Sequence, residues 1–145
     1  MKISTKGRYG VRIMLELALH FDKDLLTVRA ISQKQGISEK YIEQIISTLN
    51  KAGLVRSQRG AAGGYRLAEP PHAITVGQIL NITEGGFSFV ECLGHNSTQC
   101  DRRDECVTSD VWQEITDAIE AVVYNITLAN LVTRYYEKSN YVYMI

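Results

Sequence analysis

The cysteines of this chain, Cys92, Cys100 and Cys106, lie in a single stretch that is otherwise rich in Gly, Asn, Asp and Arg. From Phe87 to Thr108 the apolar residues follow neither a helical nor a strand period, so we expect a loop. An odd number of cysteines in a chain that begins without an apolar signal core argues against a disulfide framework. Soft thiolate ligands gathered on one loop indicate metal or redox chemistry instead.

Three kinds of chemistry suit the spacing Cys92-x7-Cys100-x5-Cys106. An iron–sulfur cluster accepts long and irregular intervals, because a cluster is wider than a single ion. Structural zinc usually takes cysteine pairs that are closer together, and redox-active thiols without metal are the third possibility. Arg102 and Arg103 would offset the negative charge of a thiolate-ligated cluster, so we expect an iron–sulfur cluster and keep zinc and free thiols as alternatives.

Three cysteines are one ligand short of a set of four. The further candidates are a group from a second protomer or a side chain of the loop itself, namely His95, Glu91, Asp101, Asp104 or Glu105. The chain shows no Ser–His–Asp arrangement, no glycine-rich nucleotide loop and no carboxylate pair placed by a motif. We therefore expect a protein that is not an enzyme and has no small-molecule substrate.

The charge pattern divides the chain into two halves. Residues 1–66 carry 12 Lys and Arg against 5 Asp and Glu, a net +7, whereas residues 67–145 carry 4 against 11, a net −7. Such asymmetry points to one half that meets a polyanion. Pro70 and Pro71 mark the change of sign. We expect residues 1–69 to bind DNA, 70–108 to form a short helix and the cysteine loop, and 109–145 to pair two protomers.

The basic half contains the pattern of a helix-turn-helix. Apolar residues recur at intervals of three and four from Tyr9 to Phe21, which predicts an amphipathic helix. Thr27 and Ser38 suit the N-caps of two further helices, and Gly36 suits the end of the first of these. The second helix of such a pair can lie in the DNA major groove. A plain helical hairpin without DNA contacts is the alternative.

A glycine-rich hairpin is predicted directly after these helices. Residues 54–58 and 65–67 have strand character, and the turn between them contains Arg59 and Gly60. Glycine lets the backbone at the tip approach a phosphate or a minor groove, where arginine is favoured. With Arg56 and Arg66 beside it, the hairpin indicates a DNA-binding wing. A surface hairpin with solvated arginines is the alternative.

Two helix starts are predicted in the acidic half. Thr75-Val-Gly-Gln78 has the form of a capping box and opens a short helix, and Ser109 or Asp110 suits the N-cap of a long one. The long helix has one apolar stripe, made of Trp112, Ile115, Ile119, Val122, Val123 and Ile126. A single protomer offers too little surface to cover this stripe, so we expect a homodimer, with a helix folded back on its own domain as the alternative.

The aromatic-rich C-terminus, with Tyr135, Tyr136, Tyr141 and Tyr143, has no pattern that assigns it a secondary structure. Thr127 suits the start of a further short helix that ends near Leu131. The fold class expected is therefore mainly α with a small β-hairpin, as a winged helix-turn-helix followed by a long dimerisation helix. Because no apolar run approaches the ~18 residues of a membrane span, we expect a cytoplasmic protein with no membrane partner.

Six segments together resemble the Rrf2 family of bacterial winged-helix transcriptional regulators, in particular its IscR-like branch. They are MKISTKGRYG, GISEKYIEQIISTLNKAGLV, RGAAGGYRL, ITVGQIL, the cysteine loop running into CVTSDVW, and NITLANLV. The resemblance implies a bacterial homodimer that binds a pseudo-palindromic double-stranded operator and represses genes of iron–sulfur cluster biogenesis. It also implies an iron–sulfur cluster of the two-iron, two-sulfur kind (2Fe–2S) on Cys92, Cys100 and Cys106. The family's histidine ligand, three residues after the last cysteine, is replaced here by Ser109, so the fourth ligand stays open.

The resemblance also implies a set of DNA contacts. The matching positions are Ser38, Lys40, Tyr41, Glu43, Gln44, Arg59 and Gly60. Gln44 suits hydrogen bonds to adenine, Glu43 suits the amino group of cytosine, and Arg59 suits a phosphate or a minor groove. The alternative function is a metal-free thiol or zinc regulator of sulfur metabolism or of the response to nitrosative stress.

Overall fold

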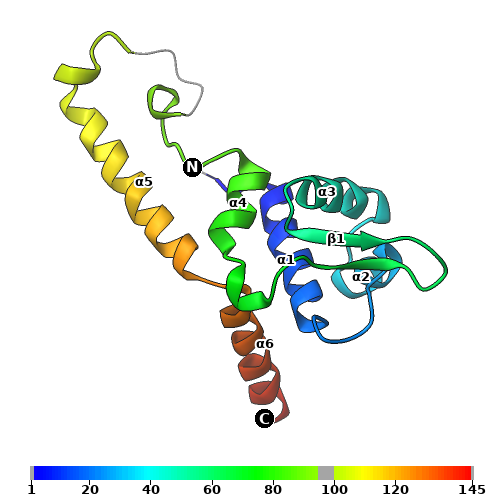
Figure 1. Cartoon of the computed structure of the whole chain (residues 1–145). Coiled ribbons are helices and arrows are strands. Elements are labelled where there is room, and N and C mark those ends of the chain that lie inside the picture. The colour runs from blue at the N-terminus through cyan, green and yellow to red at the C-terminus, as the bar shows by residue number, and fades with distance from the viewer. Residues whose placement is uncertain (1, 95–99, 145) are drawn as a thin grey trace.

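The chain folds into six α-helices and one two-stranded hairpin in a computed structural model that describes residues 2–94 and 100–144 (Figure 1). The elements are α1 (Thr5–Leu19), α2 (Val28–Gln35), α3 (Glu39–Lys51), β1 (Val55–Gln58), β2 (Gly64–Leu67), α4 (Val76–Glu84), α5 (Val107–Asn125) and α6 (Leu128–Tyr143). Short 3-10 turns lie at Pro71–Ala73, Glu91–Leu93 and Arg103–Glu105. The expected mainly helical class with a small hairpin is confirmed. In the described ranges no helix is both long and apolar enough to cross a membrane.

Helix α1 lies at the centre of the molecule and contacts α2, α3, α4, α6 and β2. Its residues Ile13, Met14 and Leu17 are buried in the hydrophobic core. Other elements also contribute side chains to this core, as far along the chain as Leu128 at the start of α6. The helix starts earlier than the predicted Tyr9, because Ser4 caps it by accepting a hydrogen bond from the Gly7 amide at 3.0 Å. This first turn is polar, so the apolar period did not reveal it.

The helix-turn-helix and the wing form as predicted. The Thr27 and Ser38 hydroxyls cap α2 and α3, and Gly36 ends α2 with a left-handed φ of 65°. Strands β1 and β2 pair antiparallel with Val55 opposite Leu67, and both of these side chains are buried. The hairpin is therefore fastened to the core by the face opposite its arginines.

Helix α4 packs on α1 and carries α5 on its other side. The predicted capping box is present, with Gln78 N donating to the Thr75 hydroxyl at 3.1 Å and Thr75 N to the Gln78 side chain at 2.8 Å. A Cβ placed on Gly77 would lie 2.6 Å from the Tyr124 ring of α5. Glycine is therefore required for the two helices to approach this closely.

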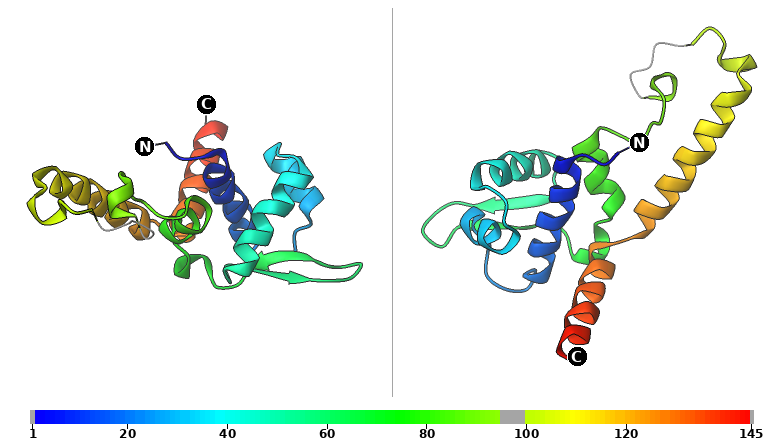
Figure 2. Two further views of the ribbon diagram at one scale, coloured as in Figure 1. Left: turned by 90° about the horizontal axis from the view of Figure 1, so that it is seen from above. Right: turned by 180° about the vertical axis from the view of Figure 1, so that it is seen from behind.

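Helix α5 stands away from the helical core for most of its length, and none of its residues is buried (Figure 2). The predicted caps Ser109 and Asp110 are wrong: Cys106 is the N-cap, and Ser109 lies in the first turn with its hydroxyl donating to the Cys106 carbonyl at 2.7 Å. Cysteine is not among the usual N-cap residues, so the sequence pointed to the next polar side chains instead.

The junction between α5 and α6 is hydrogen-bonded to the start of α4. Val76 N donates to the Ile126 carbonyl at 2.8 Å, and Leu128 N donates to the Ile74 carbonyl at 2.9 Å. The predicted end of the last helix near Leu131 is wrong, because α6 continues to Tyr143. Its later turns are exposed and carry tyrosines without a clear apolar period, which hid the helix from the sequence pattern.

Candidate nucleic-acid interface and cysteine loop

The outer face of α3 is polar and exposed over its first turns. Lys40, Glu43 and Gln44 point away from the core, while Ile42, Ile45, Ile46 and Leu49 are buried beneath them. Ser47 is also exposed and lies one turn beyond Glu43 and Gln44. The sequence interpretation did not include Ser47 in this face, although the helical period places it there. The surface offers amide, carboxylate, ammonium and hydroxyl groups, which are the groups that read base edges.

Ser38 and Tyr41 lie near the exposed face of α3 and also make contacts that position this helix. The Ser38 hydroxyl accepts a hydrogen bond from the Tyr41 amide at 3.3 Å, as an N-cap does. The Tyr41 ring is half-buried and meets the Tyr9 ring of α1 edge to face, with 5.8 Å between centroids. The structure therefore gives both residues a role in positioning α3.

The wing presents three exposed arginines, Arg56, Arg59 and Arg66. Arg56 and Arg66 are direct cross-strand partners. Among residues 2–94 and 100–144, no acidic side chain pairs with any of the three. Like charges placed opposite each other in a hairpin destabilise it, so the Arg56–Arg66 pair does not serve the stability of the wing. Two adjacent positive charges suit the binding of a polyanion instead.

Gly60 lies at the wing tip with a φ of 114°, a value that other residues adopt only with strain. No heavy atom lies within 4 Å of the position that a Cβ would occupy there. The glycine is therefore required by the backbone turn, and the tip is open to an approaching ligand.

The cysteine loop joins the end of α4 to the start of α5 (Figure 1). Cys92 lies in the turn Glu91–Leu93 and is half-buried, Cys100 is exposed, and Cys106 is half-buried at the N-cap of α5. Helix α5 has 19 residues, so Cys106 lies roughly 28 Å along it from the junction with α6. The candidate fourth ligand His95 falls outside the described residues.

Cys106 is the cysteine whose surroundings favour the thiolate. The Thr108 hydroxyl, 3.3 Å from the Cys106 Sγ, and the Ser109 backbone amide lower the pKa of this thiol below its ordinary value. The thiolate is the form that ligates metals and attacks disulfides. The start of α5 therefore offers one thiol already biased toward ligation.

The three thiols are suitable ligands for an iron–sulfur cluster, but the chain does not hold them close to one another. All three are free and none is buried in the core. Within the part of the chain that the structure describes, no three His, Cys, Asp or Glu side chains are grouped closely enough to hold a metal ion. Ligation of a cluster by Cys92, Cys100 and Cys106 would require the two arms of the loop to draw together.

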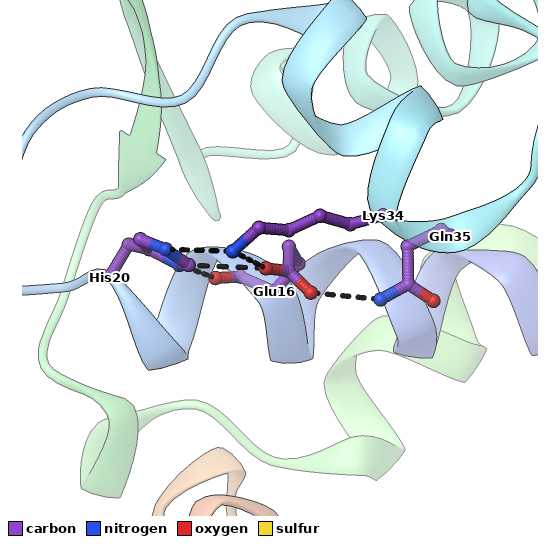
Figure 3. A network of polar contacts seen from close by, with 4 residues as sticks. All are labelled: Glu16, His20, Lys34 and Gln35. Carbon is purple, nitrogen blue, oxygen red and sulfur yellow. Dashed lines mark hydrogen bonds and ion pairs between the residues drawn. The ribbon is translucent and has the colours of Figure 1, made fainter.

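A polar network around the buried Glu16 joins α1 to α2 beside the helix-turn-helix (Figure 3). The Glu16 side chain, only 5% exposed, accepts from Gln35 Nε2 at 2.9 Å and pairs with Lys34 Nζ at 3.1 Å. His20 Nδ1 lies 2.9 Å from the Glu16 carbonyl, and Lys34 Nζ lies 3.1 Å from His20 Nε2. The sequence interpretation missed this network, because its partners are distant in the chain.

Comparison with known proteins agrees with the geometry of the helix-turn-helix and wing. The model of the Rrf2 family, described as an iron-dependent transcriptional regulator, matches residues 3–134. The HTH-type transcriptional regulator IscR of Vibrio parahaemolyticus is 40% identical over 133 residues, which cover 92% of this chain and 78% of that protein. The HTH-type transcriptional regulator CymR of Bacillus subtilis is 44% identical over 131 residues, which cover 90% of this chain and 89% of that protein.

Solved structures match most of the chain. The structure of CymR, the global cysteine regulator of B. subtilis, matches with a TM-score of 0.75 and 42% identity and covers 92% of this chain and 98% of that one. The structure of IscR from T. potens matches with a TM-score of 0.72 and 40% identity and covers 92% of this chain and 88% of that one. The chain therefore belongs to the Rrf2 family of helix-turn-helix transcriptional regulators, which are DNA-binding proteins and not enzymes.

Proposed function

We propose that this regulator is a homodimer that reads a pseudo-palindromic operator and senses the supply of iron–sulfur clusters through its cysteine loop. Residues 1–69 read DNA, residues 70–108 carry the sensing loop, and residues 109–145 pair the protomers. The genes that we expect it to repress are those of iron–sulfur cluster biogenesis.

The DNA-reading surface combines the start of α3 with the wing. Ser38, Lys40, Tyr41, Glu43 and Gln44 occupy the start of α3, where a recognition helix contacts base edges. Arg59 and Gly60 form the exposed wing tip, where a guanidinium and an open backbone suit a phosphate or a narrow minor groove. Gln44 and Glu43 supply base discrimination, and the arginines of the wing supply salt-sensitive affinity.

The dimer is supported by an apolar groove along α5. This groove has a volume of about 700 Å³ and is lined by Ile3, Leu80, Phe89, Ile115, Ala118, Ile119, Val122 and Val123. Val122 is 59% exposed in the single chain, and so large an unpartnered apolar face marks an interaction site. A second copy of α5 covers this face in our proposal. Sedimentation that gives a monomer at micromolar concentration would contradict it.

The observation that supports the sensing role is the placement of the cysteines. All three lie in the segment between α4 and α5, and each is a free thiol outside the buried core. Cys92, Cys100 and Cys106 would hold a cluster of the 2Fe–2S kind, which when bound supplies an oxygen-sensitive redox centre. Drawing Cys92 toward Cys106 moves the start of α5 relative to α4. Because α5 pairs the protomers, this movement changes the distance between the DNA-reading surfaces of the two protomers.

The direct test of the cluster is the metal content of protein purified without oxygen. We expect visible charge-transfer absorption, with iron and inorganic sulfide in equal amounts. Cys92→Ser, Cys100→Ser and Cys106→Ser should each lose these signals, and His95→Ala reports whether this histidine is the fourth ligand. Protein that binds neither iron nor sulfide would contradict the proposal.

A regulator with zinc or metal-free thiols is the second candidate. It is supported by the similarity to the structure of CymR, the global cysteine regulator of B. subtilis. Stoichiometric zinc that resists oxygen would support the zinc form. A reversible mobility change with peroxide that is lost in Cys100→Ser would support the thiol form.

A further inference from the structure

Two neighbouring side chains of α1 reach across to the helix-turn-helix. Tyr9 and Arg12 are three residues apart and therefore share a face of α1. Arg12 Nε donates to the side-chain oxygen of Gln35 at 2.9 Å, and Arg12 Nη2 donates to the Gln35 backbone carbonyl. Gln35 is the last residue of α2, where carbonyls lack partners inside the helix. The Arg12 guanidinium therefore caps the C-terminal end of α2, where positive charge is also favoured.

The turn held by Arg12 leads directly into the reading helix. The Ser32 hydroxyl of α2 donates to the Ile37 carbonyl at 2.6 Å, and the Gly36 amide donates to the Ser32 carbonyl at 2.9 Å. Ser38, the N-cap of α3, follows at once. Arg12 therefore holds the backbone at Gln35, three residues before the N-cap of α3.

The first turn of α3 is braced by the same face of α1. The Tyr9 ring packs edge to face against Tyr41 of α3, and the Arg12 guanidinium lies 5.3 Å above the Tyr9 ring. Arg12 thus contacts both the end of α2 and the ring that supports α3. A shift of its guanidinium would disturb both supports together.

The polar network around Glu16 fixes the orientation of the Gln35 side chain, which Arg12 binds. Gln35 Nε2 donates to the Glu16 carboxylate at 2.9 Å (Figure 3). The amide oxygen of Gln35 is thereby left to accept from Arg12 Nε. Lys34 balances the charge of Glu16 at 3.1 Å. A buried carboxylate with these partners is rigid, because loss of either partner leaves it poorly satisfied.

We propose that Arg12 is a positioning residue for operator discrimination, acting through Gln35 and Tyr9 on the start of α3. This inference rests on the proposed reading of an operator by α3. Arg12 supplies no base contact, and its removal lowers the preference for operator over other DNA more than it lowers general DNA affinity. Arg12 is thus a specificity determinant on α1, outside both α3 and the wing.

The test compares Arg12→Met with Arg29→Met, which removes an equal charge from an exposed site on α2. The probes are a duplex selected by the wild-type full-length protein from a random library and a shuffled duplex of the same composition. Fluorescence anisotropy gives both affinities, and circular dichroism checks folding. We expect Arg12→Met to lower the ratio of the two affinities about tenfold, as for directly coupled residues, and Arg29→Met to leave the ratio unchanged.

A second pair of variants covers the case in which Arg12→Met does not fold. Tyr9→Leu removes the ring that braces Tyr41 and should lower the ratio, whereas Tyr9→Phe keeps the ring and should preserve it. An equal loss of affinity for both duplexes in Arg12→Met would identify a phosphate contact and overturn the inference. An unchanged ratio in both Arg12→Met and Tyr9→Leu would also overturn it. If the wild type selects no sequence, the proposed operator reading itself fails.

Discussion

Exchanging Arg66 for glutamate should stabilise the fold while it weakens DNA binding. Arg56 and Arg66 are direct cross-strand partners on the exposed side of the wing. Arg66→Glu replaces a like-charge pair by an opposite-charge pair, which is worth about 1 kcal/mol in an antiparallel hairpin. For a chain of this size that gain raises the melting temperature by about 2–4 °C.

The DNA effect of the same exchange has the opposite sign. Each wing loses one positive charge and gains a negative one, so a homodimer that contacts one phosphate through each Arg66 loses two such contacts. The slope of log affinity against log salt should become shallower by about 1.8, at about 0.9 for each phosphate. Anisotropy titrations at several salt concentrations measure the slope, and thermal unfolding in low salt measures the stability.

Two control variants separate the two effects. Arg66→Gln removes the repulsion without creating an ion pair, so its melting temperature should lie between those of the wild type and Arg66→Glu. Arg56→Gln combined with Arg66→Glu should lose the added stability. A melting temperature of Arg66→Glu below that of Arg66→Gln would refute the cross-strand argument, and an unchanged salt slope would refute the phosphate contact.

Three further variants test the packing of α4 on α5, the start of α6 and the surroundings of Cys106. Gly77→Ala should lower the free energy of unfolding by about 1–3 kcal/mol in urea titrations, because the new methyl group meets the Tyr124 ring; a neutral result would mean that α4 and α5 are farther apart. Thr127→Ala should cost about 1 kcal/mol in the same assay, because it removes the N-cap of α6, and a cost near zero would argue against that cap. The pH midpoint for alkylation of Cys106 in metal-free protein should lie below that of N-acetylcysteine and should rise in Thr108→Val; an unchanged midpoint in this variant would show that the hydroxyl has no influence on the thiol.

Features set by neighbouring residues were predictable from the sequence. The caps at Thr27, Ser38 and Thr75 depend on side chains that bond to the backbone three residues later, so the residue types and their spacing were sufficient. The hairpin was predictable for a similar reason, because its glycines mark the turn between two short strands. The start of α5 was missed, since its N-cap is Cys106.

Features that join distant parts of the chain were not predictable. Glu16 and Lys34 look like ordinary exposed charges in the sequence, and only the packing of α1 on α2 brings them together. The Arg12 cap on Gln35 has the same origin. The cysteine loop was predictable from residue types and spacing. The distance between Cys92 and Cys106 was not, because it depends on how α4 and α5 pack.

In the proposed function, the state of the cysteine loop controls DNA binding. The most direct measurement is the affinity of anaerobic protein for the selected duplex at increasing iron content per dimer, in the wild type and in Cys92→Ser. We predict that the affinity or the preference over shuffled duplex changes with iron content in the wild type and stays constant in the variant. Wild-type binding that is the same at every iron content would contradict the claim.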